Sequence, residues 1–249
     1  MNQFVRAIHW IFTSANWDEV NFNTGIRGQI AYHVELSALS LGVAAAIAIP
    51  LGLLVGHKRR GQFLAVSVAN LGRAIPSFAL LVLAFIAISN LWPSLGFSLL
   101  PSTVALVLLA IPPILTNTYV GVQSVDPDTV EAARGMGLSE RQVLTRLEVP
   151  LAAPLILAGL RTSAVTVVAT ATLAGFAGGG GLGVFLYAGF TQQGQEQLLI
   201  GGAILVAVLS VLTEILFAGL ERAVTPRTRS GRKDLGLGRD GVPRAARSG

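Results

Sequence analysis

Long apolar segments separated by short polar ones make up most of this chain. A helix of roughly 20 mainly apolar residues is needed to cross a bilayer core about 30 Å thick. Five segments meet this requirement, namely residues 34–55, 74–91, 101–122, 155–176 and 199–220. The hydrophobic pattern therefore predicts an all-α polytopic membrane protein with about five transmembrane helices.

Two further apolar stretches are too short or too interrupted to cross a membrane. Residues 62–73 end at Arg73, and we expect them to form an interfacial helix that leads into the second span. Residues 4–17 carry Trp10 and Trp17, and tryptophan prefers the headgroup level of the bilayer. This N-terminal segment is therefore also expected at the interface.

The composition supports a membrane protein and excludes several kinds of site. Of 249 residues, 52% are hydrophobic and 12% are charged, against about 25% charged residues in soluble domains, and the mean hydropathy is +0.65. The chain has no cysteine, which excludes disulfides and cysteine-based metal or redox sites. The three histidines, His9, His33 and His57, are too scattered to predict a ligand cluster. We therefore expect no metal and no cofactor.

Basic residues gather in every second loop, which predicts the orientation of the chain. The loops at 92–100 and 177–198 contain no lysine or arginine, whereas the segment after residue 220 contains eight. The other basic residues of the polar loops are Lys58, Arg59, Arg60, Arg134, Arg141 and Arg146. Because cytoplasmic loops are enriched in these residues, we expect the N-terminus outside and the C-terminus in the cytoplasm. The net charge of +5 then reflects topology, and no nucleic-acid partner is expected.

The same patterns divide the chain into three parts. We expect residues 1–33 to form an extracytoplasmic or interfacial segment, residues 34–220 the transmembrane domain, and residues 221–249 a basic cytoplasmic tail. The tail has almost no apolar content and is predicted to be disordered. It is either a solvated anchor of the topology or a contact to anionic lipid.

The loop between the third and fourth predicted spans is the only long polar loop with charges of both signs. Asp126-Pro127 predicts a helix start, because an acidic N-cap precedes proline at the first helical position. Gly135 and Gly137 predict the end of this helix. We therefore expect a short cytoplasmic helix between these two signals.

A second short helix is predicted directly after the glycines. Ser139-Glu140-Arg141-Gln142 fits a capping box, in which two side chains satisfy backbone N–H groups at the helix start. Pro150 and Pro154 are expected to separate this helix from the fourth span. The loop is thus predicted to be a helix–turn–helix.

The side chains of this loop suit contact with a partner protein. Ala132 and Ala133 allow a partner surface to approach the backbone closely, and Gly137 permits a sharp chain reversal. Glu131 can pair with a basic residue of a partner or with Arg134 one turn further on. The alternative is that any polytopic protein can carry such a loop, with its charges merely solvated.

The spacing of these residues resembles the EAA loop of ABC-transporter membrane subunits. Glu131-Ala132-Ala133 is followed by three residues, Gly137, nine residues and the ending Leu147-Glu148-Val149-Pro150. The resemblance implies a type-1 ABC transmembrane domain over residues 34–220, that is, a non-enzymatic permease that a separate ABC ATPase drives. It also implies that the ATPase-coupling residues are Glu131, Ala132, Ala133, Gly137 and Pro150.

Several other segments are similar to the osmoprotectant subfamily, whose permeases transport glycine betaine, choline, carnitine and proline. These segments are Ala74–Leu80, Thr116–Gly121, Ala158–Thr162, Ala169–Ala174 and Gly179–Gly183. Arg73 departs from the small or polar residues expected directly before the first of them.

This resemblance implies a multi-pass importer of the cell membrane with three protein partners. They are the ABC ATPase, an external solute-binding protein, and either a second copy of this permease or a homologous one. Aromatic residues amount to 7% of the chain and do not cluster as a cage for a quaternary ammonium group, so we expect the external protein to recognise the solute. Two alternatives stay open: a permease for amino acids or another small polar solute, and, more distantly, an ATPase-independent secondary transporter.

Polar residues inside the predicted spans are candidates for the transport pathway or its gate. Arg161 and Glu214 lie at similar depths in the cytoplasmic half of their spans, where they either pair or extend to the headgroups. Thr162, Thr166 and Thr170 are spaced by four and share one helix face. The threonines either form a polar stripe along the pathway or bond to carbonyls of their own helix.

The run Gly178–Gly181 lacks the Gly-Lys-Ser/Thr ending of a phosphate-binding loop and is expected on the outer side. We interpret it as a flexible break at the outer mouth, where the fourth span meets a short helix.

Overall fold

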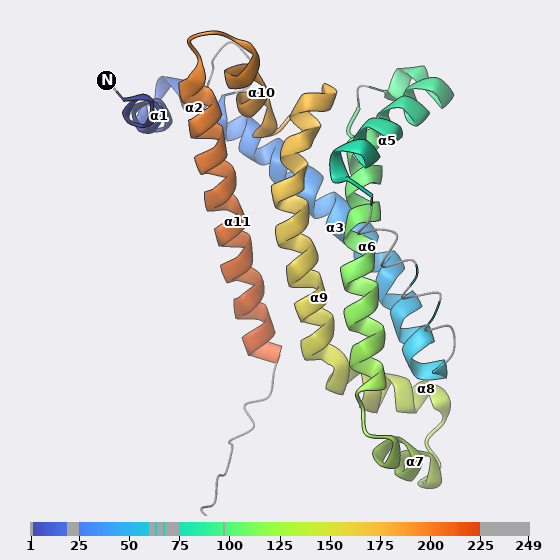
Figure 1. Ribbon diagram of the computed structural model, residues 1–249. Helices are drawn as coiled ribbons and strands as arrows, with labels where there is room; N and C mark the ends of the chain where they lie inside the picture. The colour runs from blue at the N-terminus through green and yellow to red at the C-terminus, as the bar shows by residue number, and fades with distance from the viewer. Residues whose placement is uncertain are drawn as a thin grey trace, which may run out of the picture.

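The structure, a computed structural model, describes residues 2–18, 25–59, 63, 67, 75–96 and 98–224. Every regular element in these ranges is helical, as the hydrophobic pattern predicts. The body of the molecule is formed by the long helices α3 (Ile26–Lys58), α6 (Leu100–Gln123), α9 (Val149–Thr170) and α11 (Glu196–Val224) (Figure 1).

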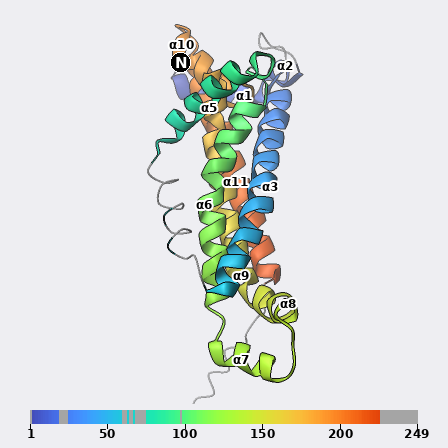
Figure 2. The same ribbon diagram turned by 90° about the vertical axis from the view of Figure 1, so that its right-hand side faces the viewer.

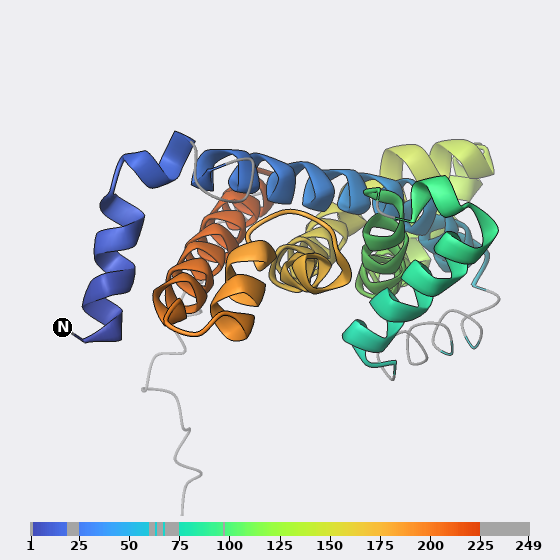
Figure 3. The ribbon, with the colours of Figure 1, turned by 90° about the horizontal axis from the view of Figure 1, so that it is seen from above.

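The long helices form two layers. Helices α6, α9 and α11 stand in one row, and α3 crosses this row obliquely on one face (Figure 3). Helix α3 packs mainly against α6 and also contacts α9. The core of the bundle lies between these three helices and includes Leu36, Leu106, Ile114 and Val167.

Shorter helices mark the two ends of the bundle (Figures 1 and 2). We call the end that carries α7 (Pro127–Gly135) and α8 (Glu140–Val143) the loop end, and the opposite end the far end. The short helices toward the far end are α1 (Gln3–Phe12), α2 (Ala15–Asp18), α5 (Ser77–Leu91), η1 (Pro93–Leu95) and α10 (Gly183–Thr191).

Within the described residues, four helical segments are long and apolar enough to cross a membrane: Ile26–Lys58, Leu100–Gln123, Glu140–Ala177 and Glu196–Val224. The second predicted span is shorter than expected, because α5 has 15 residues and begins after Pro76. Helix α3 ends at the loop end and α6 begins at the far end, where α5 also lies (Figures 1 and 2).

The two predicted domain limits fall inside helices, and two predicted segments lie largely outside the described residues. The domain limits predicted at 33/34 and 220/221 fall within α3 and α11, because both helices continue past their apolar stretches. The interfacial helix predicted at 62–73 lies outside the described residues, apart from positions 63 and 67. The tail after Val224 also lies outside them.

The predicted break before the fourth span is absent, so this prediction was wrong. Helix α8, the π-helical turn η2 (Leu144–Glu148), α9 and the 3-10 turn η3 (Ala171–Ala177) follow one another without interruption. The Val149 N–H donates to the Leu144 carbonyl five residues earlier. Pro150 then stands in the first turn of α9, where a missing N–H is tolerated. One continuous helical segment therefore joins the loop end to the bundle.

Helix α1 lies across the far end of the bundle, perpendicular to α11 (Figures 1 and 3). Its Trp10 ring packs edge-on against Phe185, with the ring centroids 5.0 Å apart. Its other face exposes Phe4, Ile8 and Phe12. An amphipathic helix with an exposed apolar face suits the membrane interface, and the interfacial position of this segment stays a prediction.

Glycines bring α3 and α6 into close contact near the loop end. A Cβ added at Gly52 would lie 2.6 Å from Thr118 Cβ, and one added at Gly56 would lie 2.6 Å from Val122 Cβ. Small residues at such positions let membrane helices approach each other closely. The contact fixes the last turns of α3 to the last turns of α6.

We predict that Gly52→Ala destabilises the bundle by about 1–3 kcal/mol, because a methyl group has no space between the two helices. Gly42→Ala on the same helix is the matched control, since a Cβ there meets no atom within 4 Å. Thermal unfolding of both purified variants in one detergent measures the difference. Equal melting temperatures would show that the glycines do not pack against α6.

Candidate functional site

The loop between α6 and α9 folds around a small apolar core of its own. This core consists of the buried residues Val125, Val130, Ala133 and Val143, with Leu138 and Leu147 packed against them. Helix α7 begins as predicted, because Asp126 Oδ1 accepts a hydrogen bond from the Asp128 N–H at 3.0 Å. The capping box of α8 is also formed, with Gln142 Oε1 accepting from the Ser139 N–H at 2.9 Å. The predicted helix–turn–helix is confirmed.

The chain reverses between α7 and α8 through a left-handed residue. Gly137 has a φ of 87°, which favours glycine. Its N–H donates to the Arg134 carbonyl at 2.9 Å. The Leu138 N–H donates to the Ala133 carbonyl at 3.2 Å. These two bonds form a Schellman motif, so Gly137 is required by backbone conformation.

The residues expected to dock a partner do not all face outward. Glu131 and Ala132 are exposed, whereas Ala133 is only 5% exposed. The Ala133 side chain packs inside the loop core and does not offer a surface to a partner, so its role in ATPase coupling stays a prediction. Met136 is 75% exposed. Its position directly before Gly137, the glycine of the turn, was the feature of the sequence that could have predicted this exposure. We call Glu131, Ala132 and Met136 the exposed face of the loop.

Arg134 pairs with Glu140 and not with Glu131. Its Nε and Nη2 atoms donate to the two carboxylate oxygens of Glu140 at 2.9 and 3.0 Å. This hydrogen-bonded carboxylate raises the pKa of the Arg134 guanidinium above its ordinary value. In the described part of the chain no ion pair involves Glu131, and its carboxylate stays available on the exposed face.

A histidine near the end of α3 joins this loop to the bundle. His57 Nδ1 lies 2.6 Å from Glu148 Oε2, and His57 Nε2 lies 3.1 Å from Glu140 Oε2. Glu148 is only 3% exposed, and a buried carboxylate needs such a partner. The contact is not predictable from the sequence, because His57 and Glu148 are 91 residues apart.

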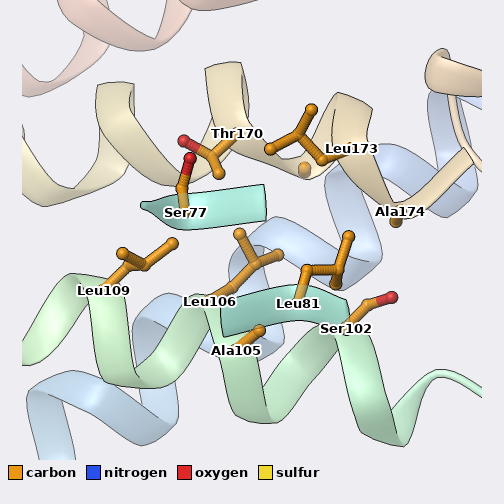
Figure 4. Close-up of a pocket in the computed structure, with 10 residues that line it drawn as sticks. Ser77, Leu81, Ser102, Ala105, Leu106, Leu109, Thr170, Leu173 and Ala174 are labelled. Atoms are coloured by element: carbon orange, nitrogen blue, oxygen red, sulfur yellow. The ribbon is translucent and has the colours of Figure 1, made fainter. Parts of the chain in front are cut away.

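A groove of about 570 Å³ opens between α6, α9 and the start of α5. Thr162, Thr166 and Thr170 line it along one face of α9, as their spacing predicts. Its other lining residues are Ile75, Pro76, Ser77, Leu109, Pro112, Pro113 and Asn117. Next to Thr170, the helices α5, α6 and η3 leave a cavity of only about 10 Å³, with the Ser77 and Thr170 hydroxyl groups side by side (Figure 4).

Both interpretations of the threonine stripe agree with this geometry. Thr162 Oγ1 donates to the Ala158 carbonyl at 2.9 Å, and Thr166 Oγ1 donates to the Thr162 carbonyl at 2.8 Å. Each hydroxyl oxygen keeps acceptor capacity and lines the groove. The role of the three threonines in the pathway stays a prediction.

The predicted pair of Arg161 and Glu214 is confirmed, and it joins α9 to α11. Arg161 Nε donates to Glu214 Oε1 at 2.7 Å, and Arg161 Nη2 contacts the same oxygen. Arg161 Nη1 also donates to Glu221 Oε2 at 3.0 Å. Glu214 and Glu221 are seven residues apart, about two helical turns, and therefore lie on the same face of α11. This spacing could have predicted from the sequence that Glu221 also contacts Arg161. Among the described residues that line the groove, none belongs to this cluster, and its part in the pathway stays a prediction.

The glycine run at the far end is tied to α3. The Gly181 N–H donates to Gln29 Oε1 at 2.7 Å, and the Leu182 N–H donates to His33 Nδ1 at 3.2 Å. Because Nδ1 accepts, the ring proton is on Nε2, which donates to the Val168 carbonyl of α9 at 2.8 Å. The helical segment does end at this glycine run. However, Gln29 and His33 of α3 hold the backbone of the run in place, whereas the sequence suggested a flexible break.

A bundle of long apolar helices with a two-helix loop at one end and a groove between its spans defines a multi-pass membrane permease. The family model of the binding-protein-dependent transport system inner membrane component matches residues 48–229. This match covers more than half of the chain, and the chain belongs to this family of inner-membrane permeases.

Curated relatives agree over most of the chain. The glycine betaine/carnitine/choline transport system permease protein OpuCB of Bacillus subtilis (strain 168) is 34% identical over 224 residues, which cover 90% of this chain and 97% of the relative. The carnitine transport permease protein OpuCB of Listeria monocytogenes is 39% identical over 194 residues, which cover 78% of this chain and 84% of the relative.

Solved structures share the fold at lower identity. A chain of the MetNI methionine ABC transporter in an inward-facing conformation is 22% identical, with a TM-score of 0.71 over 80% of this chain and 96% of that chain. A chain of an amino acid ABC transporter crystallised with histidines is 18% identical, with a TM-score of 0.58 over 80% of this chain and 93% of that chain. These structures confirm the fold of an ABC-transporter permease.

We predict that Gly137→Ala destabilises the loop by about 1–2 kcal/mol, because a Cβ disfavours the left-handed conformation. Gly135→Ala is the control: a Cβ at either position meets no atom within 4 Å, but of the two only Gly137 has a positive φ. Hydrogen–deuterium exchange of the loop amides in the membrane-embedded protein measures the difference. Equal protection in the two variants would contradict the Schellman turn.

We predict that Arg161→Met destabilises the protein more than Glu214→Gln does. The first change leaves the Glu214 carboxylate without Arg161, whereas the second leaves Arg161 paired with Glu221. The double variant Arg161→Met, Glu214→Leu should recover stability, because it also removes the carboxylate that Arg161→Met strands. Thermal unfolding checks the order, and a double variant no more stable than Arg161→Met would rule out this explanation.

Proposed function

We propose that this chain is the permease subunit of an ABC importer for small osmoprotectants of the glycine betaine, choline and carnitine class. The observation that carries the proposal is the 34% identity with the glycine betaine/carnitine/choline permease over 97% of that protein's length. The chain itself forms the membrane pathway, and ATP hydrolysis belongs to a separate subunit.

The distribution of basic residues supports a cytoplasmic position of the loop end. Most described basic residues lie there, including Lys58, Arg59, Arg134 and Arg222, whereas Arg6 of α1 and Arg27 at the start of α3 are the exceptions at the far end. The N-terminal segment then lies outside, where a binding protein delivers the solute. Residues 34–220 stay the proposed transmembrane domain, between this segment and the basic tail.

In this orientation the loop receives the movement of the ATPase, and we call it the coupling loop. Met136, the residue directly after α7, lies one turn beyond Ala132. A partner surface can therefore approach the backbone at Ala132 and bury Met136, while Glu131 offers a charge. Helix α8 continues through Pro150 into α9, and Val125 of the loop core closely follows α6. A displacement of the loop is therefore passed to both long helices that line the groove.

The groove supports a role as one wall of the solute pathway, with a second permease copy or a homologous permease as the other wall. The threonine hydroxyls and Asn117 make it polar. Pro112 and Pro113 lack an N–H, so the Leu108 and Leu109 carbonyls lose their helical donors. None of the described lining residues is aromatic, so the groove offers no cage for a quaternary ammonium group. We therefore assign the choice of solute to the external binding protein.

Uptake into proteoliposomes tests this function. The permease is reconstituted with its partner ATPase and external binding protein, and radiolabelled glycine betaine, choline and carnitine are offered. We expect ATP-dependent accumulation that requires the binding protein and disappears when the ATPase carries a Walker A lysine substitution. Accumulation of amino acids alone would show that the transported solutes are amino acids and not osmoprotectants. Accumulation driven by an ion gradient without ATP would refute the ABC mechanism.

We predict that Ala132→Arg abolishes ATPase association and uptake while the loop stays folded, because a long side chain on the exposed face prevents close approach. Ala133→Arg should instead unfold the loop, since it places an unpaired charge in the loop core. Co-purification measures association, and hydrogen exchange of the loop amides separates the two effects. Association of the Ala132→Arg variant at the wild-type level would show that the ATPase docks elsewhere.

A further inference from the structure

His57 connects three segments that are distant in the sequence. It is the penultimate residue of α3, and its ring lies between Glu140 at the start of α8 and Glu148 at the end of η2. Glu140 in turn binds Arg134 of α7. One imidazole ring thus links α3 to both helices of the coupling loop.

Both ring nitrogens of His57 are engaged. Each ring nitrogen faces a carboxylate oxygen, at 2.6 Å for Glu148 and 3.1 Å for Glu140. Both distances are within hydrogen-bond range. A single ring therefore holds two carboxyl groups of the loop in place.

Other charges surround the ring in a cavity of about 720 Å³ between α3 and α7. The charged groups around His57 and its partners are Lys58 and Arg59 of α3, Glu131 and Arg134 of α7, Glu140 of α8 and Glu148 of η2. In the part of the chain that the structure describes, the ion pairs of Glu148 include only the one with His57. The buried Glu148 carboxylate therefore depends on this ring.

The position of His57 on α3 gives the contact a mechanical consequence. Gly52 and Gly56, directly before it, hold α3 against α6. The His57 contacts add the coupling loop to the same unit. Besides them, the loop is attached to the bundle through its two chain connections, to α6 and α9, and through a long hydrogen bond of 3.5 Å from Arg59 Nη2, directly after α3, to the Val125 carbonyl.

We propose that His57 is the positioning residue that fixes the coupling loop to α3. The inference rests on the proposed role of the loop as the ATPase contact. With both ring contacts made, the loop, α3 and α6 move as one unit. When the ring is removed, the loop loses its side-chain contacts with His57 and moves more freely against α3. ATP-driven transport should then fall.

Spin-label distances test the attachment directly. The natural chain has no cysteine, so Lys58→Cys and Arg141→Cys, both at exposed positions, place one label on α3 and one on α8 of the complete transporter in lipid nanodiscs. We expect a narrow distance distribution with His57 present and a broader one when His57→Gln is added. Equal distributions with and without His57→Gln would overturn the proposal.

Uptake measurements test the functional consequence. His57→Gln should lower ATP-driven uptake by about tenfold, because it removes the partner of the buried Glu148 carboxylate. Arg146→Gln, at an exposed position two residues before Glu148, is the matched control and should follow the wild type.

The outcomes separate this inference from the proposed function. Equal uptake by the wild type and His57→Gln would overturn the positioning role of His57 while leaving the ATPase contact intact. Absence of ATP-driven uptake by the wild type would instead refute the proposed function. The spin-label distances then decide on their own whether His57 holds the loop.

Discussion

Backbone groups without a hydrogen-bond partner are costly in hydrocarbon, and the long helices of this permease conform to that constraint. Prolines nevertheless occur inside α3, α6 and α9, where each removes an N–H donor. At Pro150 a π-helical turn precedes the proline and keeps the helix continuous. At Pro112 and Pro113 the proline rings line a groove. The prolines at these two places therefore coincide with the loop connection and with the polar groove.

The features that the sequence predicted correctly depend on local rules. The apolar segments predict the long helices, since their lengths match the bilayer core. Asp126, Ser139 and Gly137 predict the start and end of the loop helices, because capping and left-handed turns involve residues within one turn of each other. The pair of Arg161 and Glu214 was predictable as well, since two charges at equal depth in adjacent spans lower their cost by pairing.

The features that the sequence did not predict depend on tertiary contacts. The His57–Glu148 and His33–Leu182 contacts join residues 91 and 149 positions apart, and no local pattern relates them. The EAA-like motif gives the residue type at Ala133. It does not show which side of α7 packs against α8. Pro150 suggested a break because the rule for isolated helices does not foresee a π-helical turn before it.

Helix α3 has a consequence for how the two mouths of the permease relate to each other. It crosses the row of the other long helices obliquely, with His33 bound to the glycine run at the far end and His57 bound to the coupling loop. These two histidines are 24 positions apart, which corresponds to about 36 Å of helix. Helix α3 thus connects the two ends of the bundle directly. A tilt of this helix therefore moves both ends at once and in opposite directions.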